Sequence, residues 1–172
     1  MRKSELTVSE ALKFSRHDFL NELQLVLMYI DLGEPIQAKK AIQNATNKLR
    51  QLSILSKLGL PATERWISTF SWIYSAFETK IYCEIESGIW KVDDLAIASY
   101  LNRVFSDVEG ILEATSEYQA SIEVRASKTN WSIDITVSGA LNEKPQVPKA
   151  ENGFFVKETI LDNLWKLTLS GN

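Results

Sequence analysis

Two long segments near the start of the chain carry apolar residues at the spacing of packed α-helices. In the first segment these residues follow one another by three, four and three positions, and they are Leu20, Leu23, Leu27 and Ile30. This spacing places them on one side of a helix, here called the apolar face, which packs against other helices. We expect the helix to run from about Ser4 or Ser9 to Asp31.

The second segment, which we expect to be helical from Glu34 to about Lys57, repeats the pattern. Its apolar positions are Ala38, Ile42, Ala45, Leu49 and Leu52, continued by Leu55 and Leu58. Gly33 favours a helix end and Pro35 a first helical turn, so the two segments form a helical hairpin. Because two such helices leave apolar surface uncovered, we predict that two copies form a dimeric four-helix bundle.

The pattern changes after Gly59-Leu60-Pro61, and we divide the chain there into domains of residues 1–58 and 62–172. A stripe at helical spacing predicts a helix from about Thr63 to Thr79. Its members are Trp66, Ile67, Phe70, Ile73, Tyr74 and Phe77. Alternation around Cys83 predicts a short strand. Asp93 or Asp94 can cap a further helix that continues to about Thr115.

The C-terminal part of the chain shows the two-residue alternation of β-strands. Segments 121–127 and 131–138 are joined by a turn at 128–130. After a proline-containing loop at 140–152, segments 154–161 and 164–169 flank Asp162-Asn163, a pair suited to the positive φ angles of a tight hairpin turn. We therefore predict an α+β domain in which helices cover one face of a largely antiparallel sheet.

Composition changes this picture little. The 172 residues are 45% hydrophobic and 24% charged, as in globular proteins. The single Cys83 excludes an internal disulfide, fits a reducing compartment and is read equally well as a small buried hydrophobe. No apolar run approaches the roughly 20 residues of a membrane span, and the residues after Met1 do not resemble a signal-peptide core. We expect a cytoplasmic protein.

The net charge of −3 conceals an asymmetry. Residues 1–58 hold nine Lys or Arg against six Asp or Glu, whereas residues 59–172 hold ten against sixteen. The mild basic excess around the hairpin favours an acidic partner, although an ordinary solvated surface has the same composition. The chain lacks a dense basic stripe with interleaved aromatic residues, so we expect no nucleic-acid binding.

The only histidine of the chain, His17, lies beside the apolar face of the first helix. At about 100° per residue it points roughly 60° away from Leu20 and within about 20° of Gln24, so we expect it to face solvent. Asp18, the clearest neighbouring metal ligand, points about 100° away, and we expect no metal site. A lone helical histidine is by itself most often a surface residue without chemistry.

The residues around His17 resemble a known family. The run Ser15-Arg16-His17-Asp18-Phe19, followed by Asn21, Leu23 and Gln24, is similar to that of the sporulation initiation phosphotransferase B family. This family is related to sensor histidine kinases, whose dimerisation helices carry a similar Arg-His-Asp-aromatic-x-Asn stretch. The order of a helical hairpin and an α+β domain is also similar. The resemblance implies that the second domain is an α/β sandwich like a degenerate histidine-kinase ATPase domain.

The resemblance leaves two activities open, kinase and phosphotransferase, and the second domain distinguishes them. A kinase domain of this type holds Mg²⁺ with two helical asparagines and brings glycine-rich loops close to the phosphates. Set against that helix, Ser106 and Gly110 occupy the asparagine positions. After a strand ending near Val137 only Gly139 follows, and residues 142–152 contain no glycine. We therefore expect no nucleotide binding.

These features favour a phosphorelay phosphotransferase, which the resemblance links to sporulation initiation. His17 would take a phosphoryl group from the phospho-aspartate of one response-regulator receiver domain and pass it to a second response regulator, a transcription factor. We expect no cofactor on this chain, because the receiver supplies Mg²⁺. Arg16 is expected to contact phosphoryl oxygens or the acidic pocket of the receiver.

The other polar residues near His17 receive accessory roles in this interpretation. Asp18 would orient the ring, while Asn21 and Gln24 would line the docking groove. Two alternatives stay open. One is a sensor-type histidine kinase module that autophosphorylates His17 from ATP, and the other is a dimeric adaptor in which His17 is incidental.

Overall fold

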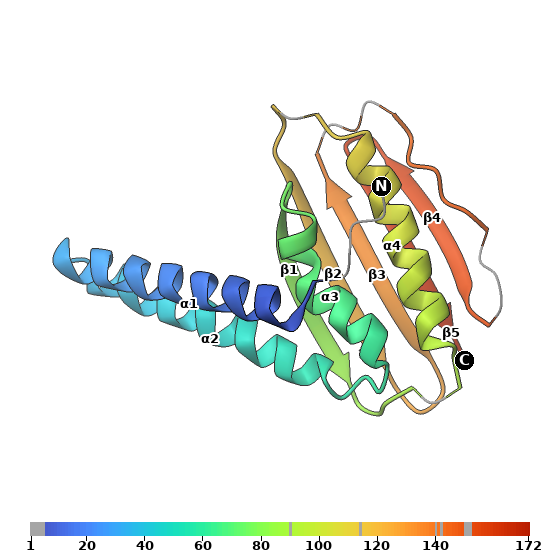
Figure 1. Cartoon of the computed structure of the whole chain (residues 1–172), viewed down its shortest axis with the longest axis horizontal. Helices are drawn as coiled ribbons and strands as arrows, with labels where there is room; N and C mark the ends of the chain where they lie inside the picture. The colour runs from blue at the N-terminus through green and yellow to red at the C-terminus, as the bar shows by residue number, and fades with distance from the viewer. Residues whose placement is uncertain (1–5, 90, 114, 140, 142, 150–152) are drawn as a thin grey trace. The chain divides into compact units, whose positions relative to one another are not determined.

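The computed structural model describes residues 6–89, 91–113, 115–139, 141, 143–149 and 153–172, which form two compact units (Figure 1). The units are Met1–Gln51 and Leu52–Asn172, so they divide earlier than the boundary expected after residue 58. The reason lies in Leu55 and Leu58, which are fully buried in the core of the second unit.

The first unit contains the predicted helical hairpin of α1 (Val8–Asp31) and α2 (Pro35–Leu55), whose last residues belong to the second unit. The side chain of Thr7 accepts a hydrogen bond from the backbone N–H of Glu10, and the Glu10 carboxylate accepts one from the N–H of Thr7. This capping box fixes the start of α1 at Val8, whereas the alternative start at Ser4 lies outside the described residues. Gly33, with φ of 71°, lies in the turn between the end of α1 and Pro35, the first residue of α2.

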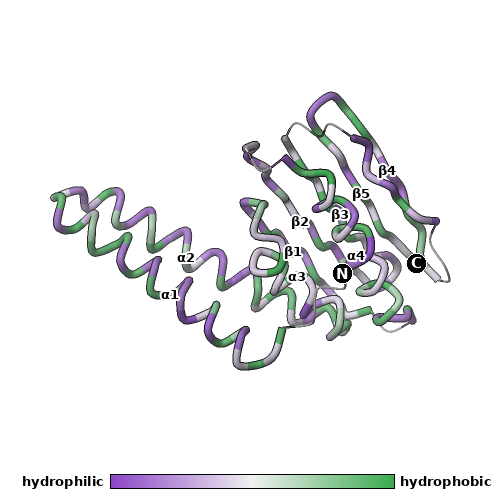
Figure 2. Tube along the Cα trace, turned by 45° about the horizontal axis from the view of Figure 1, so that its top comes forward, coloured by the Kyte–Doolittle hydropathy of each residue, from purple (hydrophilic) through white to green (hydrophobic). Residues whose placement is uncertain are grey.

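The apolar face of α1 is uncovered in the single chain. Leu20, Leu23, Leu27 and Ile30 are 45–58% exposed, and α1 has no buried residue. On α2, only the small residues Ala38 and Ala41 of the first unit are buried. Figure 2 shows hydrophobic positions recurring along both helices of the hairpin. The hairpin therefore packs through small side chains and leaves its larger apolar side chains exposed.

The second unit is a mixed five-stranded sheet with two helices on one face (Figure 1). Along the chain its elements are α3 (Pro61–Ile73), β1 (Phe77–Ile85), α4 (Asp94–Gly110), β2 (Tyr118–Ala126), β3 (Trp131–Ser138), β4 (Phe155–Leu161) and β5 (Leu164–Gly171). The strand order is β1-β2-β3-β5-β4, and of the four strand pairings among the described residues only that of β1 with β2 is parallel. This confirms the predicted α+β class and the largely antiparallel sheet.

The prediction that one helix continues to Thr79 was wrong. Helix α3 ends at Ile73, and Phe77 already belongs to β1. Phe70, Tyr74 and Phe77 all pack against the ring of Phe105, with centroid distances of 5.0, 5.8 and 6.2 Å. Because these aromatic residues share one core cluster, their periodicity did not reveal where the helix stops.

Two other boundaries also differ from the prediction. Helix α4 ends at Gly110 rather than near Thr115, and β2 begins at Tyr118 rather than at residue 121. The Tyr118 hydroxyl accepts a hydrogen bond from the backbone N–H of Glu113 at 3.1 Å, which ties the connection back to the strand. Glycine is a poor helix former, consistent with the end of α4 at Gly110.

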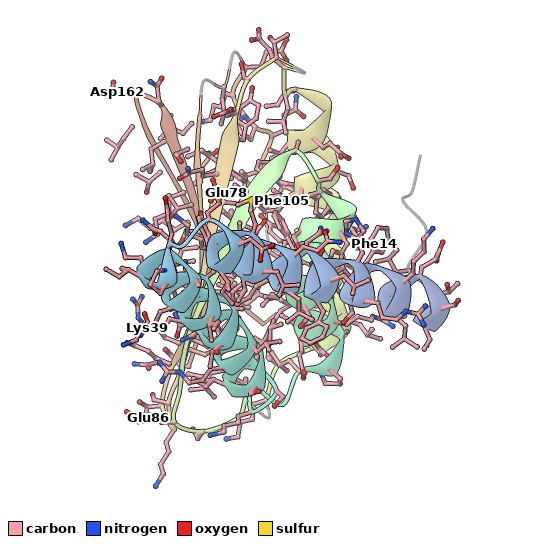
Figure 3. All side chains as sticks on the ribbon, turned by 90° about the vertical axis from the view of Figure 1, so that its left-hand side faces the viewer. Phe14, Lys39, Glu78, Glu86, Phe105 and Asp162 are labelled. Carbon is pink, nitrogen blue, oxygen red and sulfur yellow. The ribbon has the colours of Figure 1, made fainter. Side chains whose placement is uncertain are left out.

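The turn between β4 and β5 follows the prediction in part. Asp162, at the tip of this hairpin (Figure 3), has φ of 41°. Within the described residues it is the only non-glycine residue with a positive φ, so Asn163 does not share this conformation. Asp162 alone therefore provides the positive φ that the tight turn requires.

Among the described residues, none of the helices combines the length and the apolar character that crossing a membrane requires.

Candidate functional site

His17 lies on α1 with its ring largely in solvent. Its side chain is 70% exposed. Asn21, one helical turn further on, places its side-chain nitrogen Nδ2 3.2 Å from Nδ1 of the ring. The carboxylate oxygen Oδ1 of Asp18 lies 3.8 Å from the same ring nitrogen. One helical turn thus brings together three of the residues that the sequence singled out.

The two ring nitrogens of His17 have different surroundings. Among the described residues, both polar contacts of the ring involve Nδ1. If the Asn21 amide turns by half a rotation, its oxygen faces the ring and accepts a hydrogen bond from Nδ1–H. The Asp18 carboxylate favours the same proton position. This tautomer leaves a lone pair on Nε2, the form in which imidazole is a nucleophile.

A residue that the sequence reasoning missed completes this group. Lys48 of α2 places its ammonium nitrogen 3.8 Å from Oδ2 of Asp18. The sequence spacing around the turn indicates that Lys48 lies opposite Asp18, because Asp18 precedes Gly33 by 15 residues (33 − 18) and Lys48 follows it by 15 (48 − 33). Residues equally distant from the turn of an antiparallel hairpin lie opposite each other.

Arg16 and Gln24 do not contact the ring of His17. Both are exposed on α1. Arg16 points about 100° away from His17, and Gln24 lies about 10 Å further along the helix axis. In the described part of the chain the candidate site therefore groups His17 with Asp18, Asn21 and Lys48, and Arg16 and Gln24 lie outside this group.

Cys83 is part of the core rather than of a site. It lies buried in β1, where burial raises the pKa of its thiol to about 11. The thiol is therefore protonated at neutral pH and unreactive. The described residues also contain no group of three or more His, Cys, Asp or Glu side chains that could hold a metal ion.

In the second unit, two of the positions compared with a kinase domain lie on α4 and the third, Gly139, has a structural role. Ser106 lies on α4, and Gly110 is the last residue of that helix. Gly139 has φ of 143°, and a Cβ at this position would collide with the ring of Tyr118. Packing and backbone conformation therefore explain this glycine without a phosphate nearby.

The segment 143–149 is tied to the elements beside it. The Tyr100 hydroxyl of α4 donates a hydrogen bond of 2.7 Å to the backbone oxygen of Pro148. Lys144 forms an ion pair of 3.4 Å with Glu158 of β4. The buried Phe154, which follows this loop, packs edge-on against Tyr100 at a centroid distance of 5.5 Å. These contacts hold the segment against α4 and the sheet.

The chain thus consists of a helical hairpin with an exposed histidine, followed by a mixed α+β domain. This is the arrangement that the sequence motif predicts. Residues 1–58 match the model of the α-helical domain of SpoOB-type sensor kinases. This match covers 58 of the 172 residues and confirms, for the hairpin, the resemblance seen around His17.

Several solved structures are similar to the chain at low sequence identity. The histidine kinase AdeS of Acinetobacter baumannii is 12% identical, with 91% of this chain and 97% of that chain covered and a TM-score of 0.43. A bacterial phosphotransferase is 12% identical, with 98% of this chain and 100% of that chain covered and a TM-score of 0.41. The histidine kinase ThkA, in a structure with the response regulator TrrA, is 16% identical, with 94% of this chain and 60% of that chain covered and a TM-score of 0.40. No curated protein matches the chain.

Proposed function

We propose that this protein is a phosphorelay phosphotransferase that moves a phosphoryl group between the aspartates of two response-regulator receivers through a phosphohistidine at His17. The observation that carries the proposal is the exposed ring of His17, whose two polar contacts both involve Nδ1. The match of the hairpin to the SpoOB-type model supports phosphotransfer. We propose that this transfer serves the sporulation phosphorelay, which the resemblance around His17 implies.

The chemistry requires little from this chain. The lone pair of Nε2 attacks the phosphorus of a receiver phospho-aspartate, the N–P bond forms, and the P–O bond breaks with its electron pair going to the aspartate oxygen. The Nδ1 proton stays on the ring beside Asp18 and Asn21. A second receiver aspartate then attacks the phosphorus, and the N–P electrons return to Nε2. Positioning supplies most of the catalysis in such a loose transfer.

The remaining charges come from the partner in this proposal. The receiver contributes Mg²⁺, so the site on α1 needs no metal of its own. Arg16, the residue before His17, is exposed, and we propose that it contacts phosphoryl oxygens or the acidic pocket of the receiver. Gln24 and Asn21 extend the contact surface along the same helix.

A homodimer is the second part of the proposal. The four residues of the apolar face on α1 are about half exposed in the single chain, and Ile42 and Leu49 of α2 are 52% and 60% exposed. A second copy would cover these side chains in a four-helix bundle. His17 lies at the edge of the apolar face and stays accessible in such a bundle.

The kinase alternative is less well supported by the second unit. Ser106 and Gly110 provide no amide oxygens for Mg²⁺. The segment 143–149 follows β3, where a kinase carries a loop that lies over the nucleotide, and here Tyr100 holds it against α4. We therefore propose a phosphotransferase without ATP-dependent autophosphorylation.

One labelling experiment tests the proposed function. The purified chain is incubated with radiolabelled ATP alone, and separately with receiver domains of the same organism phosphorylated by radiolabelled acetyl phosphate. We expect label on His17 only from a phosphorylated receiver. Labelling by ATP alone would support the kinase, and no labelling in either reaction would support the adaptor.

Variants of His17 make the test specific. His17→Ala and His17→Gln should both abolish labelling, since neither side chain has a nucleophilic nitrogen. Both should keep the melting temperature of the parent, because a side chain that is 70% exposed contributes little to packing. Normal transfer through either variant would contradict the role of His17.

A further inference from the structure

We infer that Lys48 of α2 is a positioning residue for His17, acting across the hairpin through the carboxylate of Asp18. This inference rests on the proposed function, since it concerns the same ring. It adds to the candidate site a residue of the second helix, which lies outside the sequence motif on α1.

The geometry places the carboxylate of Asp18 between two cationic or proton-bearing groups. Its Oδ2 lies 3.8 Å from the Lys48 ammonium, and its Oδ1 lies 3.8 Å from Nδ1 of His17. One oxygen is thus directed to α2 and the other to the ring. Attraction by Lys48 restrains the rotation of the carboxylate and keeps Oδ1 turned towards Nδ1.

The exposure of the three groups suits a positioning role better than a role in stability. The Asp18 side chain is 37% exposed, and those of Lys48 and His17 are 54% and 70% exposed. Exposed ion pairs contribute little to the free energy of unfolding. The pair can nevertheless set the direction of a short side chain, because Asp18 has only two rotatable bonds.

The consequence concerns the ring proton. With Oδ1 facing Nδ1, the neutral ring keeps its proton on Nδ1 and its lone pair on Nε2. Without Lys48 the attraction that restrains the carboxylate is lost, and the preference for a proton on Nδ1 weakens. The Asn21 amide can present either its oxygen or its nitrogen to Nδ1, and its nitrogen, which lies 3.2 Å from Nδ1 here, favours the proton on Nε2, where it blocks the attacking lone pair.

Nitrogen NMR of the full-length protein measures this directly, because His17 is the only histidine and its two ring nitrogens give the only imidazole signals. The chain is labelled with ¹⁵N-histidine and observed unphosphorylated at pH 8. We expect Nδ1 to carry the proton in the parent and in Lys48→Arg, which keeps the charge. In Lys48→Gln we expect the proton to shift measurably towards Nε2.

Two further variants complete the design. Asp18→Asn should shift the proton in the same direction as Lys48→Gln. Lys39→Gln removes the same charge from an exposed position of α2 (Figure 3), about 13 Å from Lys48 along the helix axis, and should leave the spectrum unchanged. Transfer from a receiver phosphorylated by acetyl phosphate should slow by up to about fivefold in Lys48→Gln, and Lys48→Arg should restore it.

The outcomes separate this inference from the proposed function. A Lys48→Gln spectrum identical to that of the parent overturns the inference, whether or not Asp18→Asn changes the spectrum, while labelling of His17 by a receiver would still stand. An equal effect of Lys39→Gln also overturns it, since the cause would then be overall charge. If no receiver labels the parent protein, the proposed function fails independently of the NMR result.

Discussion

At the scale of single residues, Asp134 of β3 is the clearest case of a carboxylate held by its surroundings. It is 7% exposed, accepts a hydrogen bond of 2.6 Å from the Thr168 hydroxyl, and lies 3.0 Å from the Lys166 ammonium. Arg125 approaches the same carboxylate at 3.7 Å. Burial raises the pKa of Asp134, but the hydrogen bonds from Thr168 and Lys166 and the charge of Lys166 outweigh it, so the pKa lies below its usual value.

We expect Asp134→Asn to lower the free energy of unfolding by about 1.5–3 kcal/mol at neutral pH, the range for hydrogen bonds to charged groups. A carboxyl whose pKa is lowered by folding stabilises the folded state above its unfolded-state pKa of about 4, and this stabilisation is lost as the pH falls through the lower folded-state value. Urea unfolding at pH 7 and pH 3 should show a smaller difference between parent and variant at pH 3. An equal difference at both values would contradict the assignment.

At the scale of elements, two adjacent aspartates start two helices. Asp93 accepts a hydrogen bond from the backbone N–H of Ala96 at 3.0 Å and caps α4. Asp94 accepts bonds from the N–H groups of Ala62 and Thr63 at 2.7 and 2.8 Å, so a residue of α4 caps α3. The sequence offered either aspartate as the cap of α4 and gave no sign that the second serves another helix.

Asp94→Ala should therefore destabilise the protein by about 1–2 kcal/mol, because two N–H groups at the start of α3 lose their acceptor. Thermal and urea unfolding measure the loss. Asp107→Ala, at an exposed position of the same helix, is the matched control and should cost less than about 0.5 kcal/mol. Equal losses in the two variants would show that the cap is unimportant.

At the scale of the whole molecule, the exposed apolar face determines the expected assembly. Leu23→Asp and Leu49→Asp place a charge where the bundle would exclude water, which costs several kcal/mol in the dimer. Both positions are exposed in the single chain, at 45% and 60%, so the monomer should stay folded. Sedimentation should show a dimer for the parent and folded monomers for the variants, while Leu95→Asp, at a 68% exposed position of α4, should remain dimeric. A monomeric parent protein would contradict the bundle.

The second unit should not respond to nucleotide. We expect millimolar ATP with Mg²⁺ to give no phosphohistidine and no shift of the melting temperature, because the asparagine and glycine contacts are missing. A ligand present at its Kd stabilises by about 0.4 kcal/mol, so titration to the highest soluble concentration is needed. Saturable stabilisation by ATP would show that the segment 143–149 can open to admit it.

The sequence by itself determined the hairpin, the position of His17 on its first helix and the turn at Asp162. These features depend on the helical period, on Gly33 and Pro35, and on the conformational preferences of single residues. The grouping of His17 with Asn21 follows in the same way, because four residues make about one helical turn. Local rules were sufficient wherever the interacting residues are close in the chain.

Only the tertiary structure decided the end of α3, the parallel pairing of β1 with β2 and the approach of Lys48 to Asp18. Phe70 and Phe77 read as one helical stripe, yet they reach Phe105 from a helix and from a strand. Lys48 lies 30 residues from Asp18 (48 − 18), and although the turn places the two residues opposite each other, only the packing of α1 against α2 brings their charged groups to 3.8 Å. These features arise from contacts between distant segments, whose free energy overrides local preference and has no local period.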